Sequence, residues 1–133
     1  MTHEPGTFHA RHRAEQLLSF VGLRWGKITP TDFDLFIDFG GRGFVLGEIK
    51  YRDAPLHRGQ ELALERAADA WDKAGIPTLT LVASHSTDIG DVIVADASVV
   101  RFRWKGQWHD TKQPITVGAA VNRFHQRCTE TAA

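Results

Sequence analysis

Two apolar runs joined by a glycine-rich turn constrain the fold of this chain more than any other feature. In residues 33–39 the odd positions are apolar and alternate with Asp34, Phe36 and Asp38, the period of two that is typical of a strand. Residues 44–50 form a second apolar run, and the glycine-rich segment 40–43 lies between the two. Glycine adopts positive φ at little cost, so the pattern predicts a β-hairpin with one buried face.

The segment after the hairpin predicts a helix followed by a buried strand. Gln60, Leu64, Ala67 and Trp71 fall on one face of a helix, which Gly75 should end. Residues 76–84 then read as a buried strand, whose helical crossover should be right-handed if the two strands are parallel. This order of elements predicts an α/β fold.

Weaker patterns flank this central part. Apolar positions from residue 10 to residue 21 recur at helical spacing before Gly22, which predicts a first amphipathic helix. Residues 91–95 and 98–104 predict short strands, and a Lys105-Gly106 turn leads into residues 107–109. Helical spacing after Thr116, a suitable N-cap, predicts a terminal helix.

Composition narrows the class of protein. The chain has 133 residues and a single cysteine, so we expect one domain over residues 1–133, with a core at about 10–85 and an extension at about 86–133. No run approaches the ~20 apolar residues that span a bilayer, and we therefore expect a cytoplasmic protein without a membrane partner. Lys and Arg against Asp and Glu number four to two in residues 1–30, six to twelve in 31–100 and six to two in 101–133. The acidic middle suits a cation, and the basic ends suit a polyanion.

Three residues of the hairpin carry groups that phosphodiester hydrolysis requires. Asp34 and Glu48 lie on the two predicted strands, and Lys50 shares a face with Glu48 because residues two apart in a strand point the same way. Carboxylates are suitable ligands for Mg²⁺ or Mn²⁺, and the Ile49 carbonyl could face the same cation. A lysine ammonium can hold and polarise the attacking water.

These residues resemble the PD-(D/E)XK nuclease superfamily, the restriction-endonuclease-like fold that includes Holliday-junction resolvases. The matching stretches run from Asp32 to Phe39, from Val45 to Tyr51, and through Gln60 to a helix that contains residues 66–71. The resemblance covers about residues 10–85 and implies an α-β-β-β-α-β core with a mixed sheet, a first strand near 23–28, and a C-terminal hairpin and helix beyond it.

The resemblance also implies roles for individual residues. Asp34, Glu48 and the Ile49 carbonyl would bind Mg²⁺ or Mn²⁺, Lys50 would orient water, and Gln60 would complete the site. The proline-aspartate pair of the family is spread here over Pro30, Asp32 and Asp34, so either aspartate fits as the ligand. Glu15 is the one candidate for the glutamate that the family often carries on its first helix.

Hairpin geometry adds a condition on this site. Asp34 and Glu48 face each other only if the sum of paired residue numbers is even, whereas a two- or four-residue loop around Gly41 and Arg42 makes that sum odd. We therefore predict an odd-length turn or a glycine bulge within residues 40–43.

Cations interleaved with aromatic residues suggest a contact with nucleic acid. Arg101, Arg103 and Lys105 lie among Phe102, Trp104 and Trp108, and Arg52 and His57 flank the predicted site. The same alternation also fits an ordinary half-buried hairpin.

Taken together, the residues favour a metal-dependent endonuclease that hydrolyses DNA, with RNA not excluded. A small domain leaves little room for sequence recognition, so we expect structure-selective or partner-directed cleavage, and a homodimer would make two cuts. The alternative is an inactive module of the same fold that binds nucleic acid or a protein.

Overall fold

A computed structural model describes residues 17–131 and divides the chain into two compact units, residues 1–30 and residues 31–133. Each unit is described by itself. No helix within the described residues is long and apolar enough to cross a membrane.

The described part of the first unit, residues 17–30, has little regular structure. Its one feature is an isolated antiparallel bridge in which Trp25 and Ile28 exchange backbone hydrogen bonds of 2.9 Å. The predicted strand near 23–28 is therefore wrong. The predicted helix over 10–21 is wrong for its described residues, 17–21, and lies otherwise outside them. Leu17 and Val21 are 96% and 94% exposed, and a short amphipathic segment without a packing surface is a poor helix in water.

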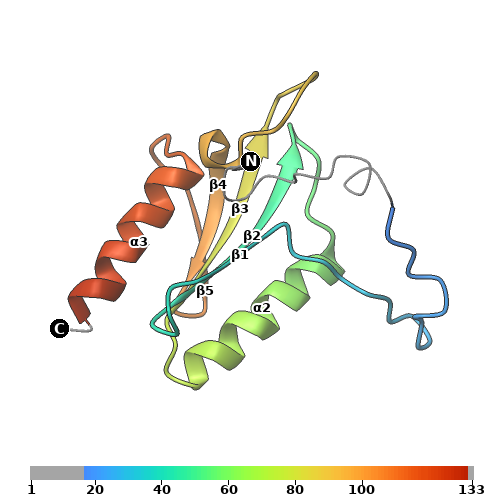
Figure 1. The fold of residues 1–133 in the computed structure, drawn as a ribbon, viewed down its shortest axis with the longest axis horizontal. Helices are drawn as coiled ribbons and strands as arrows, with labels where there is room; N and C mark the ends of the chain where they lie inside the picture. Colours follow the sequence, from blue (N-terminus) through green and yellow to red (C-terminus); the bar gives the residue numbers. More distant parts are fainter. Residues whose placement is uncertain (1–16, 132–133) are drawn as a thin grey trace, which may run out of the picture. The chain divides into compact units, whose positions relative to one another are not determined.

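The second unit is a mixed α/β structure with a five-stranded mixed sheet and two α-helices (Figure 1). Neighbouring strands follow chain order, and only the β2–β3 pair is parallel. The elements are β1 (Leu35–Asp38), β2 (Phe44–Tyr51), α2 (Arg58–Lys73), β3 (Thr78–His85), the 3₁₀ helix η1 (Val94–Asp96), β4 (Ser98–Trp104), β5 (Gln107–Asp110) and α3 (Val117–Thr131).

Most of the predicted elements are present. The hairpin, the helix after Pro55, the following strand, the second hairpin and the terminal helix are confirmed, and Thr116 caps α3 because its Oγ1 accepts a hydrogen bond from the Ala119 amide at 3.2 Å. The predicted strand over 91–95 is wrong. There Ile93 is 59% exposed, and turn bonds to its carbonyl and to that of Val94 form η1 instead.

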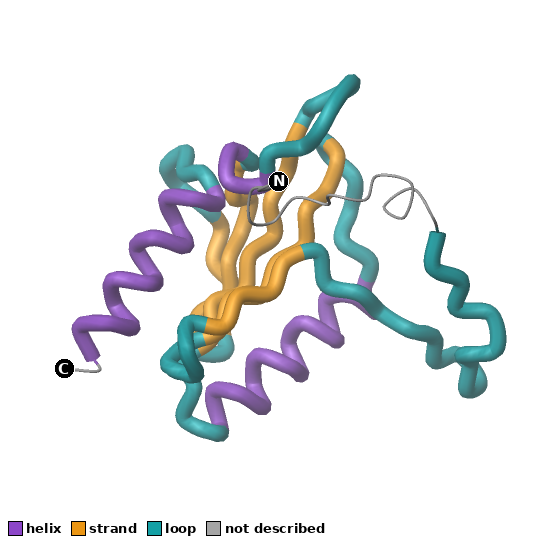
Figure 2. Tube along the Cα trace, in the orientation of Figure 1, coloured by secondary structure: helices purple, strands orange, loops and turns teal. Residues whose placement is uncertain are grey.

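The predicted order of the core needs a correction as well. In the described residues two strands, not three, precede α2, so the α-β-β-β-α-β order is not observed there. Three further elements, β4, β5 and α3, complete the sheet and cover it (Figure 2).

The two helices cover opposite faces of the sheet (Figure 1). Phe44 of β2 packs against Trp71 of α2 with ring centroids 4.7 Å apart, whereas Trp104 of β4 packs against Phe124 of α3 at 5.8 Å. The nine buried residues of the main apolar cluster lie on the α3 side: Val45, Leu79, Leu81, Ala83, Ala97, Val99, Val117, Phe124 and Cys128. The core therefore lies mainly between the sheet and α3.

Candidate active site

The turn of the first hairpin decides which residues share a face. Asp38 pairs with Phe44, and the Phe39 amide donates to the Gly43 carbonyl at 3.0 Å, so residues 39–43 form a five-residue connection. Gly40 and Gly41 have φ of 64° and 78°, which glycine adopts without strain. The paired residue numbers sum to an even value, and the predicted odd-length turn is confirmed.

Asp34 lies one residue before β1, at the position opposite Glu48 in this register. Its Oδ2 accepts a hydrogen bond from the Ile49 amide at 2.8 Å. In an antiparallel pair the amide and carbonyl of one residue point to the same side. The Ile49 carbonyl is therefore expected on the same edge of β2 as the Asp34 carboxylate.

A partly buried network joins β2 to the first turn of α2. Gln60 Nε2 donates to Glu48 Oε1 at 3.1 Å, and Lys50 Nζ donates to Gln60 Oε1 at 3.0 Å. Lys50 Nζ also lies 3.8 Å from Glu48 Oε1, and Glu48 is only 4% exposed. The Gln60 amide thus bridges the carboxylate and the ammonium, which fixes both side chains.

The electrostatics of this network favour a proton or a cation on Glu48. Burial, followed by the negative charge of Asp34, raises the pKa of Glu48 from its ordinary 4.5 to about 7, against the opposing effect of Lys50. A hydrogen bond between the two carboxyl groups contributes to the rise. Asp34 and Glu48 are therefore close enough to share a proton, and Asp32 acts on Glu48 more weakly than Asp34 does.

The donor set fits a hard divalent cation. The described residues contain no group of three or more His, Cys, Asp or Glu side chains suited to a metal. Mg²⁺, however, commonly binds one or two protein carboxylates and keeps several waters. The Asp34 and Glu48 carboxylates with the Ile49 carbonyl meet that requirement, because a cation between the carboxylates would replace the proton that they otherwise share.

The arginines predicted to contact DNA are neutralised by acidic residues of α2. Arg101 Nη2 lies 2.6 Å from Glu61 Oε2, and the guanidinium stacks 4.2 Å from the centre of the Trp108 ring. Arg103 is 7% exposed, and its Nη1 lies 2.8 Å from Asp69 Oδ1. The structure therefore places Arg101 and Arg103 in contacts that attach α2 to the sheet.

The remaining predicted residues lie apart from the network or only adjoin it. His57 is the N-cap of α2, and its amide donates to Gln60 Oε1 at 3.4 Å. Lys105 lies in the β4–β5 turn, with Nζ 5.8 Å from the centre of the Trp104 ring. Glu15 lies outside the described residues.

Asp88 makes a contact with Tyr51 and Arg52 that the sequence did not indicate. Both of its carboxylate oxygens lie 3.2 Å from Arg52 Nη2, and Oδ1 also accepts a hydrogen bond from the Tyr51 hydroxyl. This contact ties the end of β2 to the loop after β3. A single aspartate in an irregular loop carries no periodic signal, so only the folded chain identifies it.

Comparisons with protein-family models, curated proteins and solved structures found no match to this chain.

Proposed function

We propose that the protein is a metal-dependent phosphodiesterase that cleaves DNA. The observation that carries the proposal is the network in which the Gln60 amide holds Glu48 and Lys50, with Asp34 beside Glu48. It combines adjacent carboxylates with a fixed ammonium, the groups that charge neutralisation and water activation require.

The residues divide the chemistry between them. Asp34, Glu48 and the Ile49 carbonyl would hold Mg²⁺ or Mn²⁺, which when bound supplies positive charge to the pentavalent transition state. Lys50 uses one N–H to bind Gln60 Oε1, and an ammonium has further donors with which to hold a water. The fixed positive charge favours hydroxide over neutral water, so Lys50 would activate the nucleophile.

Gln60 is the positioning residue of this site. Its carbonyl oxygen accepts from Lys50 and its amide nitrogen donates to Glu48. A reversed amide would instead place two donors together at Lys50 and two acceptors together at Glu48. The amide therefore sets the direction of the ammonium and of one carboxylate oxygen. We expect Gln60→Ala to retain metal binding and to lose part of the rate.

The inferred substrate is DNA in a branched, nicked or single-stranded form. The described sheet and its two α-helices offer little surface with which to read a sequence, which makes structure-selective or partner-directed cleavage the better fit. One observation favours the non-catalytic alternative: Arg52, Arg101 and Arg103 are all paired with carboxylates, so few free cations surround the network. A non-catalytic module of the same fold would need no free cation beside this network, whether it binds a protein or binds nucleic acid elsewhere on its surface.

The test is cleavage of linear duplex, branched, nicked and single-stranded DNA, and of RNA, with Mg²⁺ or Mn²⁺. We expect Lys50→Ala to lower the cleavage rate by roughly 10²- to 10⁴-fold, the range for loss of a group that assists proton transfer. Arg66→Ala removes an exposed cation from the same helix as Gln60 and should leave the rate unchanged. If the wild-type protein cleaves none of these substrates with either metal, the non-catalytic alternative replaces the proposal.

A further inference from the structure

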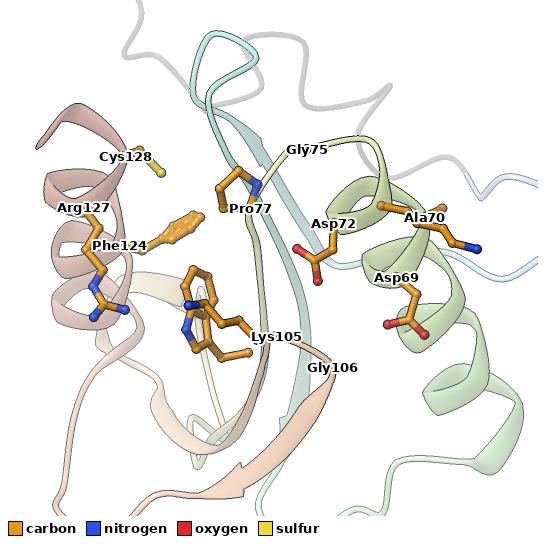
Figure 3. A pocket seen from close by; sticks show the side chains of 12 residues that line it. Asp69, Ala70, Asp72, Gly75, Pro77, Lys105, Gly106, Phe124, Arg127 and Cys128 are labelled. Carbon is orange, nitrogen blue, oxygen red and sulfur yellow. The ribbon is translucent and has the colours of Figure 1, made fainter. Parts of the chain in front are cut away.

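A long groove lies away from the candidate active site. One cavity of about 1210 Å³ lies between the last turns of α2 and α3, beside Pro77 (Figure 3). A second cavity of about 840 Å³ lies under α3 and reaches Leu81 and Val99 of the core. Both are lined by Trp104, Phe124 and Arg127, so we treat them as one continuous surface, the α3 groove.

Aromatic rings form the centre of the α3 groove. Phe124 meets the Trp104 ring edge to face, with centroids 5.8 Å apart and planes at 81°. Trp104 is only half-buried, and Phe102 lines the second cavity beside it. Phe124 therefore holds the Trp104 indole in a fixed orientation and leaves part of it accessible from the groove.

Positive charge surrounds these rings. Arg127 Cζ and Lys105 Nζ lie 5.7 and 5.8 Å from the centre of the Trp104 ring. Among the described residues, those that line the second cavity include no aspartate or glutamate. The exposed cations that line the groove as a whole are Lys73, Lys105, Lys112, Arg123 and Arg127.

Two carboxylates line the first cavity and offset part of this charge. Asp69 Oδ1 lies 2.8 Å from Arg103 Nη1 and is neutralised by it. Asp72 Oδ1 accepts the Thr78 amide at 3.1 Å, and burial raises the pKa of that carboxyl. The groove therefore combines an aromatic floor with a surplus of cations.

We propose that the α3 groove binds a single strand of nucleic acid, with its phosphates on the cations and a base stacked on Trp104. Surfaces that bind single strands combine a positively charged groove with aromatic side chains on which bases stack. In a duplex the bases are stacked on each other, so none is available to a ring inside a groove. A fatty acid carries one charge, whereas several cations line the groove.

The α3 groove is separate from the site built on Glu48 and Lys50. Those residues lie toward the carboxyl end of β2, whereas the first cavity adjoins Pro77, just before the amino end of the parallel strand β3. The proposal therefore does not depend on phosphodiester hydrolysis. It is tested in Lys50→Ala protein with EDTA, in which binding alone is measured.

The experiment follows the anisotropy of labelled oligothymidylate of about fifteen nucleotides over a range of salt concentrations, with oligouridylate as the RNA probe. Removal of two phosphate contacts by Lys112→Ala with Arg123→Ala should weaken binding and lower the log–log salt slope by about 1.4. Arg42→Ala with Arg66→Ala removes the same charge from exposed positions outside the groove and should change neither quantity. Equal effects of the two pairs would overturn the proposal.

Base stacking is tested separately. Trp104→Leu should weaken binding about tenfold, within the range for loss of one stacked base, whereas Trp104→Phe should retain most of the affinity. An abasic oligomer of the same length should bind weakly to the Lys50→Ala protein, with about the affinity that oligothymidylate has for the Trp104→Leu variant. Trp104→Leu should not change the affinity for the abasic oligomer. Thermal melting checks that each variant is folded. If Trp104→Leu does not fold, the salt dependence of the Lys112→Ala, Arg123→Ala variant decides the outcome.

Three results would contradict a single-strand site. The first is no binding of either oligomer at low salt. The second is a duplex that binds as tightly as the single-stranded oligomer and whose affinity Trp104→Leu does not change. The third is tighter binding of a labelled peptide of alternating glutamate and phenylalanine, which would assign the groove to an acidic protein partner.

Discussion

The two faces of the sheet bury different kinds of side chain. Among the described residues, the buried polar or charged side chains are Glu48, Thr78, Thr80 and Arg103, and the strand register places all of them on the α2 face. The main buried apolar cluster lies on the α3 face. The α2 face also buries Leu46, Leu64, Ala68 and Val82, so it mixes polar and apolar side chains, whereas the main buried cluster on the α3 face is apolar.

The difference shows what each helix contributes. Helix α2 supplies partners for buried polar groups, since Gln60 binds Glu48 and Asp69 binds Arg103. Helix α3 supplies apolar surface, such as Phe124 and Cys128. Changes on the α3 face should therefore alter stability through lost or excessive packing, and changes at the polar positions of the α2 face should act through protons and hydrogen bonds.

The largest effect on stability is expected on the α3 face. Leu81 is 1% exposed within the main apolar cluster, so Leu81→Ala should lower the free energy of unfolding by about 3 kcal/mol through lost transfer energy and a residual cavity. Urea denaturation measures the change. Val100→Ala, at a position 51% exposed, is the control and should cost less than about 0.5 kcal/mol. Equal costs at the two positions would remove the distinction between core and surface.

A pH dependence is expected from the α2 face. The folded state raises the pKa of Glu48 from 4.5 to about 7, so it binds this proton more tightly than the unfolded chain does. The contribution is full below pH 4.5 and is lost as pH rises through 7, by about 3 kcal/mol in all, since one unit of pKa corresponds to about 1.4 kcal/mol.

Denaturation of metal-free protein at pH 5 and pH 8, compared with Glu48→Gln, measures this contribution. The wild type should lose stability relative to the variant over that interval, and Mg²⁺ should stabilise the wild type more at pH 8 than at pH 5, because it competes with the proton. A wild type that gains stability relative to Glu48→Gln would contradict the raised pKa.

Close packing of the hairpin on α3 predicts a smaller effect. A Cβ at Gly43 would lie 2.5 Å from Cys128 Sγ and 3.0 Å from Phe124 Cζ. Gly43→Ala should therefore cost roughly 1.5 kcal/mol, within the range for overpacked cores. At Gly59 in α2 an added Cβ would have no contact within 4 Å, so Gly59→Ala should be neutral or stabilising. In combination with Cys128→Ala the cost of Gly43→Ala should fall, and strict additivity in a double-mutant cycle would argue against the contact.

The smallest effect concerns a buried hydroxyl on the α2 face. Thr80 is fully buried, and its Oγ1 has no hydrogen-bond partner among the described residues. Thr80→Val should leave stability unchanged or raise it by up to about 1 kcal/mol, because an unpaired polar group is removed without a change of shape. Thr78→Val should instead destabilise, since Thr78 Oγ1 donates to the Ile76 carbonyl at 3.0 Å. Thermal melting of the two variants compares them.

Much of this fold could be predicted because its elements have clear periods and clear ends. Alternation in residues 33–39 and the glycine turn were enough to infer the hairpin, and the condition that Asp34 and Glu48 share a site was needed to infer its odd-length connection. Helical phase was enough to place Gln60 on the side of α2 that meets β2. The roles of these residues in catalysis remain predictions.

What could not be predicted depends on contacts between elements. Alternation placed Arg101 and Arg103 on one face of β4, but no local pattern showed that acidic residues of α2 cover that face. The segment 91–95 has apolar residues without a neighbouring strand, so turn bonds formed η1. The cations of the α3 groove come from distant parts of the chain, and only the packing of α3 and the β4–β5 turn brings them together.

Mutations that remove one carboxylate of the Asp34–Glu48 pair should tend to increase the stability of the fold. Folding holds two carboxyl groups together and ties Asp34 to the Ile49 amide, although their charges repel. A substitution such as Glu48→Gln relieves that repulsion, so a lineage freed from the need for the pair would gain stability by losing it. A descendant chain that keeps both acids gives up that gain in stability. Its retention of the pair would therefore indicate continued selection for the ligand that binds between them.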